Sequence, residues 1–235
     1  MDRQDLIDWI TEQPHAGKRF KEQEAEQVER LYRTLDRFCT HLCEEHGIER
    51  IEDTTLDALR RFEFHYSEND DQHLRLAFSH LGRDDLTEFL GMVSADKYFR
   101  NKTLTVILKA MDDLKGYNKS LRKAGIRMAS ELLERGATPE ARAQLEEATG
   151  VPVDVLLNMV QCCDLCRMTG MAGQALRRSL AMGYDTLDKF RASTPEQIEA
   201  EFSEYLRASG ERTNRMVSFA SFIHQARKLE DVVAY

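Results

Sequence analysis

The sequence predicts an all-α protein, and three observations lead to this fold class. Apolar residues recur at steps of three and four along the 235 residues, and no segment keeps the strict alternation of a strand. Glycine and proline, which interrupt helices, number only 12 and 4. Charged residues make up 31% of the chain and apolar residues 42%, which suffices for a hydrophobic core beneath solvated helix faces.

The charge is unevenly distributed, and it predicts two domains. Residues 1–100 contain 14 Lys and Arg against 23 Asp and Glu, whereas residues 101–235 contain 19 against 18. We expect an acidic helical bundle in residues 1–100 and a second helical domain in residues 101–235. Residues 100–127, which we call the basic segment, carry eight cations and two carboxylates. Such asymmetry says more about binding partners than about the fold.

In the first domain we expect helices over residues 2–12 and 19–46. The second of these carries an apolar stripe, Val28, Leu31, Leu35, Phe38 and Leu42, which favours packing inside a bundle, with a dimer seam as the alternative. Asp53-Thr54-Thr55 caps the next helix, Gly82 ends another, and Asp84 to Val93 forms a further one. Ser94 is expected to cap a longer helix that reaches Leu114.

The second domain contains an internal repeat. The segment SLRKAGIRMASELLERGATPE resembles SLAMGYDTLDKFRASTPE, about 58 residues later. Thr138-Pro139 and Thr194-Pro195 each place a capping hydroxyl before a proline at the first helical position, and Gln197 would complete a capping box with Thr194. A helix over Val153–Met168 joins the repeats, and a last helix covers about residues 216–229.

The stretch LCRMTGMAGQALRRSLAMG, between the repeats, predicts helix, tight turn, helix. The turn is Thr169 to Gly173, and the second helix ends before Gly183. Backbone N–H groups that open such a helix lack intrahelical partners and suit a phosphate oxygen, which is the principle of the helix-hairpin-helix motif. A purely structural turn is the alternative. The candidate contacts here are Gly170, Met171, Ala172, Gly173, Arg177 and Arg178.

The basic segment supplies four more candidate contacts, because it contains more cations than a solvated helix face needs. These are Lys115, Lys119, Arg122 and Lys123. They lie on a helix and on the turn that occupies the position of a first hairpin, just ahead of the repeat. Asp164 and Arg167, three residues apart, are expected to form a salt bridge that braces the second hairpin, with a phosphate contact by Arg167 as the alternative.

From about residue 112 to Tyr235 the chain resembles an uncharacterised bacterial family, a domain of unknown function with tandem helix-hairpin-helix units. The resemblance covers about half of the chain and implies a fold rather than an activity. It departs from the family pattern at the first hairpin, residues 113–118, at Ala172, and at Phe222 and Glu230 in the tail. The matching segments are LRKAGIRMASELLERGATPEARAQLEEATGVP, DLCRMTGMAG, MGYDTLDKF, TPEQIEAEF and FIHQARKLEDVVAY.

Neither the cysteines nor the histidines form a recognisable catalytic or metal-binding pattern. Buried apolar cysteines explain Cys162, Cys163 and Cys166 on one helix, and Cys39 and Cys43 near His46, because neither cluster holds two Cys-x-x-Cys pairs. A solvated face explains His65, His73 and His80 among Glu63, Glu68, Asp70 and Asp71. We therefore expect no metal, no cofactor and no enzymatic activity.

The expected function is sequence-nonspecific binding of nucleic acid, with DNA favoured over RNA, through backbone contacts of the helix-hairpin-helix units. The alternative is a protein–protein scaffold whose hairpins are structural, and a metal-dependent enzyme is a distant third. No apolar run approaches the roughly 20 residues of a membrane span, and the acidic N-terminus is unlike a signal peptide. Five cysteines without an export signal indicate reduced thiols in the cytoplasm.

Overall fold

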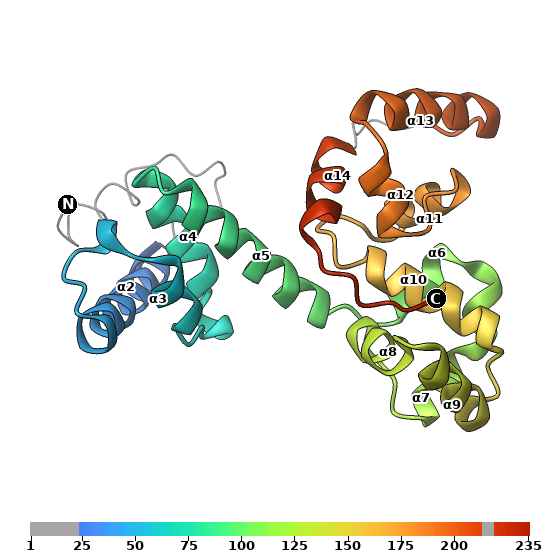
Figure 1. The fold of residues 1–235 in the computed structure, drawn as a ribbon, viewed down its shortest axis with the longest axis horizontal. Coiled ribbons are helices and arrows are strands. Elements are labelled where there is room, and N and C mark those ends of the chain that lie inside the picture. Colours follow the sequence, from blue (N-terminus) through green and yellow to red (C-terminus); the bar gives the residue numbers. More distant parts are fainter. Residues whose placement is uncertain (1–23, 213–218) are drawn as a thin grey trace. The chain divides into compact units, whose positions relative to one another are not determined.

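The computed structural model describes residues 24–212 and 219–235. Within these residues the regular elements are all helices, which confirms the all-α prediction (Figure 1). The helix expected over residues 2–12 lies outside them. The chain divides into two compact units, Met1–Lys97 and Tyr98–Tyr235. The boundary expected at residue 100 lies close to this division.

The N-terminal unit is built on the apolar stripe of its long first helix. Leu31, Leu35, Phe38 and Leu42 are buried, and the ring of Phe38 meets those of two other core residues edge to face, at centroid distances of 5.1 and 5.8 Å. These four residues of the stripe thus pack inside the unit rather than forming a dimer seam, and the side chain of Val28 lies outside the described part. The helices are α2 (Glu24–His46), η1 (Ile51–Asp53), α3 (Leu56–Arg61), η2 (Tyr66–Glu68), α4 (Asp70–His80) and α5 (Asp84–Arg100).

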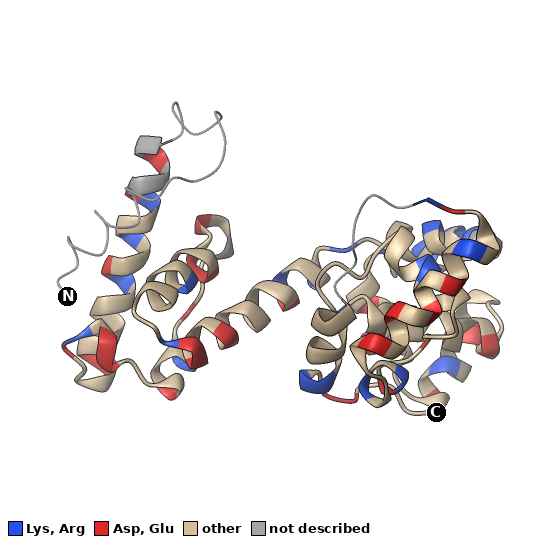
Figure 2. Ribbon diagram, turned by 90° about the horizontal axis from the view of Figure 1, so that it is seen from above, with Lys and Arg blue, Asp and Glu red and all other residues tan. Residues whose placement is uncertain are grey.

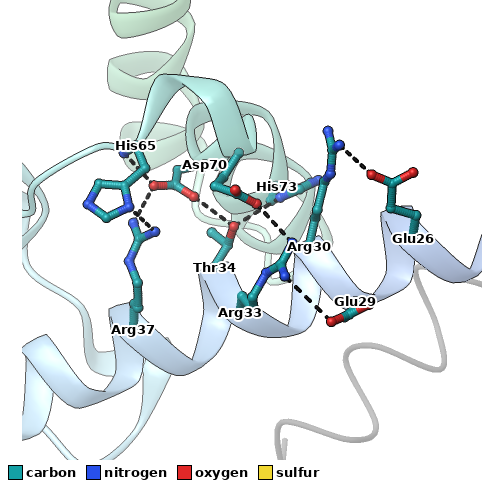
Figure 3. A network of polar contacts seen from close by, with 10 residues as sticks. Glu26, Glu29, Arg30, Arg33, Thr34, Arg37, His65, Asp70 and His73 are labelled. Atoms are coloured by element: carbon teal, nitrogen blue, oxygen red, sulfur yellow. Dashed lines mark hydrogen bonds and ion pairs between the residues drawn. The ribbon is translucent and has the colours of Figure 1, made fainter.

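A buried carboxylate ties α2 to α4. Asp70 is 0% exposed and accepts hydrogen bonds from the guanidinium of Arg37, from the hydroxyl of Thr34 at 2.7 Å and from the backbone N–H of His65 at 2.6 Å (Figure 3). Because Thr34 donates its only proton to Asp70, its oxygen accepts from Nδ1 of His73, 3.0 Å away. The solvated face expected here is wrong for Asp70, because α2 supplies partners that satisfy its carboxylate inside the unit, whereas Glu63 and His65 are exposed as expected.

The neighbouring Asp71 is also fully buried. Its contacts show why the helix start expected at Ser94 is wrong. It accepts hydrogen bonds from the hydroxyl of Ser94 and from Nζ of Lys97 at 3.2 Å. Ser94 therefore lies inside one continuous helix, α5, instead of capping a new one. Helix α5 ends at Arg100. Beyond it the backbone bonds to another segment, because the N–H of Leu104 donates to the carbonyl of Arg127 at 2.9 Å.

The C-terminal unit packs its helices around one large apolar cluster. Helix α8 lies against α10, and α12 lies against α14, so each repeat contributes to the same core (Figure 1). The last helix buries Phe219, Phe222, Ile223 and Ala226. The elements are α6 (Thr105–Ala110), η3 (Asp112–Tyr117), α7 (Asn118–Lys123), α8 (Ala129–Gly136), α9 (Pro139–Thr149), α10 (Val153–Leu165), α11 (Gln174–Ala181), α12 (Leu187–Ala192), α13 (Pro195–Ser209) and α14 (Phe219–Lys228).

The two repeats share their turn geometry. Gly125 after α7 and Gly183 after α11 have φ angles of 81° and 89°, which glycine adopts without strain. In each case the next N–H reaches back five residues, from Ile126 at 3.0 Å and from Tyr184 at 2.8 Å, and closes the helix as a Schellman cap.

The threonine–proline signals also cap helices as expected. Thr138 accepts the N–H of Ala141 at 3.2 Å, and Thr194 accepts that of Gln197 at 3.3 Å. The capping box at Thr194 is incomplete, because the amide of Gln197 donates to Glu201 instead, at 3.2 Å. These caps begin α9 and α13 respectively.

The segment after α14 returns to the first repeat. The N–H of Ala234 donates to the carbonyl of Ala137 at 2.8 Å, and Arg142 donates to the carbonyl of Ala234 at 2.7 Å. Arg167 holds the same segment through the carbonyl of Glu230 at 2.9 Å. Residues 230–234 thereby join elements that are far apart in the sequence.

In the described part of the chain, no helix combines the length and the apolarity that crossing a bilayer requires.

Candidate nucleic-acid interface

The turn between α10 and α11 has the expected glycine conformations. Gly170 has a φ angle of 88° and Gly173 one of 51°. Gly170 is exposed, whereas Met171 between them is 0% exposed and belongs to the core. The N–H of Thr169 donates to the side chain of Gln225 in α14 at 2.7 Å. Helix α14 therefore anchors the turn. The N–H of Met171 donates to the carbonyl of Met168 at 3.1 Å, so it does not fit the predicted role as a donor to phosphate.

We expect Gly170→Val to destabilise the protein by about 1–3 kcal/mol, because valine resists a φ of 88°. A Cβ at this position would also lie 3.7 Å from the ring of Phe222. Thermal melting measures the effect. Gly116→Val is the matched control, since a Cβ there meets nothing within 4 Å. Equal melting temperatures for the two variants would contradict the role of the turn described here.

One cation of the basic segment lies inside the unit. Lys102 is 5% exposed, and its ammonium donates to the carbonyl of Cys166 at 2.5 Å and to that of Met171 at 3.5 Å. It lies 4.7 Å from the ring centroid of Tyr98. Burial lowers its pKa below the ordinary value. Lys102 therefore stabilises carbonyls of the turn rather than an external ligand.

Arg178 is also internal, which does not fit its predicted role as a phosphate contact. It is 5% exposed, pairs with Glu211 at 2.9 Å, and lies over the ring of Phe202 at 5.6 Å from the centroid. Spacing along α11 alone suggested that Arg177 and Arg178 would act together. Arg178 instead lies on the core-facing side of α11, where the carboxylate of Glu211 balances its positive charge.

Arg177, on the outer side of α11, is exposed and joins the turn to the basic segment. Its guanidinium donates to the backbone carbonyl of Lys109 at 2.7 Å. Helix α11 packs on α6, α6 on η3, and η3 on α7. Arg177 on α11 is therefore connected to the predicted contacts on η3 and α7 through a succession of packed helices.

The four predicted contacts of the basic segment, Lys115, Lys119, Arg122 and Lys123, are all exposed. Leu121 in α7 is fully buried and anchors this helix, so the polar residues of α7 remain outside. Among the residues that the structure describes, none forms an ion pair with Lys119, Arg122 or Lys123. Figure 2 shows lysine and arginine together with acidic residues along the helices of the unit.

Asp164 and Arg167 form the brace expected at the end of α10, with 2.6 Å between Oδ1 and Nη1. Burial raises the pKa of Asp164, and the hydrogen bond from Arg167 opposes this effect. The side chain of Arg167 is 15% exposed, and the second contact of its guanidinium is the carbonyl of Glu230. This geometry agrees with the structural role and leaves Arg167 outside the set of exposed cations.

The three cysteines of this region are poor nucleophiles and poor metal ligands as they stand. Cys162, Cys163 and Cys166 are buried. Burial raises the pKa of Cys162 to about 12 and that of Cys166 to about 11, and raises the pKa of Cys163 well above the ordinary value. Because the thiolate is the reactive form, these groups act as small apolar side chains of the core.

The C-terminal unit is thus an all-helical domain with paired repeats and a local set of exposed cations. Residues 114–229 match the model of a family described as a domain of unknown function, DUF4332. This segment, which extends from η3 to the end of α14, is therefore similar to that family. Neither a curated protein nor a solved structure matches the chain.

Proposed function

We propose that the C-terminal unit binds the phosphate backbone of nucleic acid without reading base sequence and without catalysis. The exposed cations Lys115, Lys119, Arg122 and Lys123 supply the attraction to phosphates. Arg177, which is exposed on α11, and the turn at Gly170 supply the helix-hairpin-helix part of the proposed interface. Contacts of this kind position a protein on the strand but carry no sequence information.

One observation carries the proposal. Lys119, Arg122 and Lys123 are exposed within five consecutive residues and form no ion pair with the described residues, so their charge is available to an external anion. The whole chain has a net charge of −8, which would repel nucleic acid unless the attraction were local. Lys102 and Arg178 contribute nothing to it because they are buried.

A titration across a salt series tests this function, with duplex DNA, single-stranded DNA and RNA as ligands. Each neutralised phosphate releases counterions, so the logarithm of the binding constant should fall with the logarithm of salt concentration, by about 0.9 per contact on duplex and about 0.7 on single strands. The four exposed cations of the basic segment and Arg177 would make five contacts, so we expect a duplex slope of about −4.5.

Failure of all three nucleic acids to bind at low salt would refute the proposal. In that case the protein–protein scaffold replaces it, and the same exposed cations would meet an acidic protein partner. Affinity that varies strongly between unrelated sequences would contradict backbone recognition and point to contacts with the bases.

A further inference from the structure

Three side chains with metal-binding atoms meet at the carboxyl end of α2, in the N-terminal unit. His41, Glu45 and His46 each offer one such atom, and these atoms lie within 4.8 Å of one another. Sequence reasoning had considered His46 together with Cys39 and Cys43, and so missed this group. The signal that would have found it is the spacing of His41 and Glu45, which places them one turn apart on the same side of a helix.

The hydrogen bond of His41 fixes which of its nitrogens faces Glu45. Its Nε2 lies 3.0 Å from the carbonyl oxygen of Ala58. Because a carbonyl oxygen only accepts, Nε2 carries a proton and donates it. The other nitrogen, Nδ1, lies 3.3 Å from Oε1 of Glu45. An imidazole lone pair and a carboxylate oxygen do not bind each other, so a cation between them, a proton on Nδ1 or a metal ion, would make this approach favourable.

His46 adds a second observation that distinguishes these possibilities. Its Nε2 is buried and has no hydrogen-bond partner within the described residues. Buried polar atoms seldom stay unsatisfied, and a proton on His41 would leave this atom as it is. The rings of His41 and His46 lie 5.0 Å apart, edge to face. A metal ion between these side chains would bind the unpartnered Nε2 of His46. The same ion would balance the negative charge of Glu45.

We propose that His41, Glu45 and His46 bind a divalent transition-metal ion of the zinc type. Imidazole nitrogens and a carboxylate oxygen are common zinc ligands, and a backbone carbonyl that accepts from the second ring nitrogen is the usual way in which a ligating histidine is oriented. Bonds of about 2.0–2.2 Å set tetrahedral ligand atoms about 3.4 Å apart. The separation between His41 and Glu45 is already 3.3 Å.

The surroundings favour this site. The side chain of His41 is 8% exposed, and its ring packs 5.5 Å from that of Phe62, which holds the ligand in place. All three residues lie in the last turns of α2, where the helix dipole attracts cations. Glu45 is exposed, whereas both histidines are half-buried, so an ion reaches the site from solvent on the side of Glu45. Three protein ligands leave a fourth position for water.

Titration of the full-length protein with Zn²⁺, after removal of metal by a chelator, tests the proposal by calorimetry and by thermal melting. We expect one site per chain and a melting temperature that rises with Zn²⁺, because the ion binds only the folded arrangement. Glu45→Gln and His46→Gln should each weaken binding at least tenfold and remove the rise in melting temperature.

Two control variants separate this site from adventitious binding. Glu44→Gln removes the same charge from the adjacent, exposed residue, and Cys43→Ser removes the exposed thiol on the same helix. Both should bind Zn²⁺ as the natural sequence does. The proposal is overturned if Glu45→Gln and His46→Gln bind as tightly as the natural sequence, or if Cys43→Ser alone abolishes binding. It does not depend on nucleic-acid binding, which the titrations with duplex and single strands test separately.

Discussion

Replacement of Lys119, Arg122 and Lys123 together by glutamate is expected to abolish nucleic-acid binding at moderate salt. Three attractive contacts become three repulsive ones, and the counterion release that these three residues supply is lost. The fold should persist, because these side chains are exposed and form no ion pairs with described residues. Fluorescence anisotropy with a labelled duplex measures binding, and circular dichroism verifies the helices.

A matched variant tests whether the position of the charges matters. Arg61→Glu, Arg75→Glu and Arg207→Glu together change the net charge by the same amount at other exposed positions. We expect this variant to keep most of the affinity. Equal losses in the two triple variants would mean that only the overall charge matters, and full binding by the first variant would exclude these residues as contacts.

Asp70→Asn should destabilise the N-terminal unit by about 3–5 kcal/mol, which is the cost of breaking a buried charge pair. The three groups that face Asp70, from Arg37, Thr34 and His65, are all donors. Asparagine keeps the shape but replaces one acceptor oxygen by a further donor, and the guanidinium of Arg37 loses its counter-charge. Urea unfolding followed by circular dichroism measures the change.

The control for this variant is Asp57→Asn, which makes the same substitution in an exposed pair. Asp57 and Arg61 are 3.1 Å apart, and their side chains are 66% and 65% exposed. We expect a change of no more than about 0.5 kcal/mol there. Similar effects at both positions would mean that Asp70 is not the polar centre of its unit.

Features that depend on neighbouring residues could be predicted from the sequence. The stripe of α2 recurs with the helical period, so burial of Leu35 and Phe38 follows from the pattern. The caps at Thr138 and Thr194 need only the next three residues. The turn at Gly170 follows from the conformational freedom of glycine in the same way.

The errors concern charged residues whose partners lie far away in the sequence. Arg178 meets Glu211 33 residues later, and Asp70 meets Arg37 at the same separation. Lys102 finds its carbonyl partner 64 residues away. Charged side chains are almost never fully buried without such a partner, and no local pattern indicates where the partner will be. The sequence around these charged residues therefore predicts exposed helix faces, whereas the structure buries their side chains.

The return of residues 230–234 to the first repeat affects how the C-terminal unit folds. In an open array of repeats each unit contacts only its neighbours, and parts of the array can melt independently. Here Ala234 contacts Arg142, 92 residues earlier. The second repeat is therefore connected to the first both by the chain that precedes it and by the segment that follows it. Such closure raises the contact order, which slows folding, and it couples the repeats so that neither melts without loosening the other.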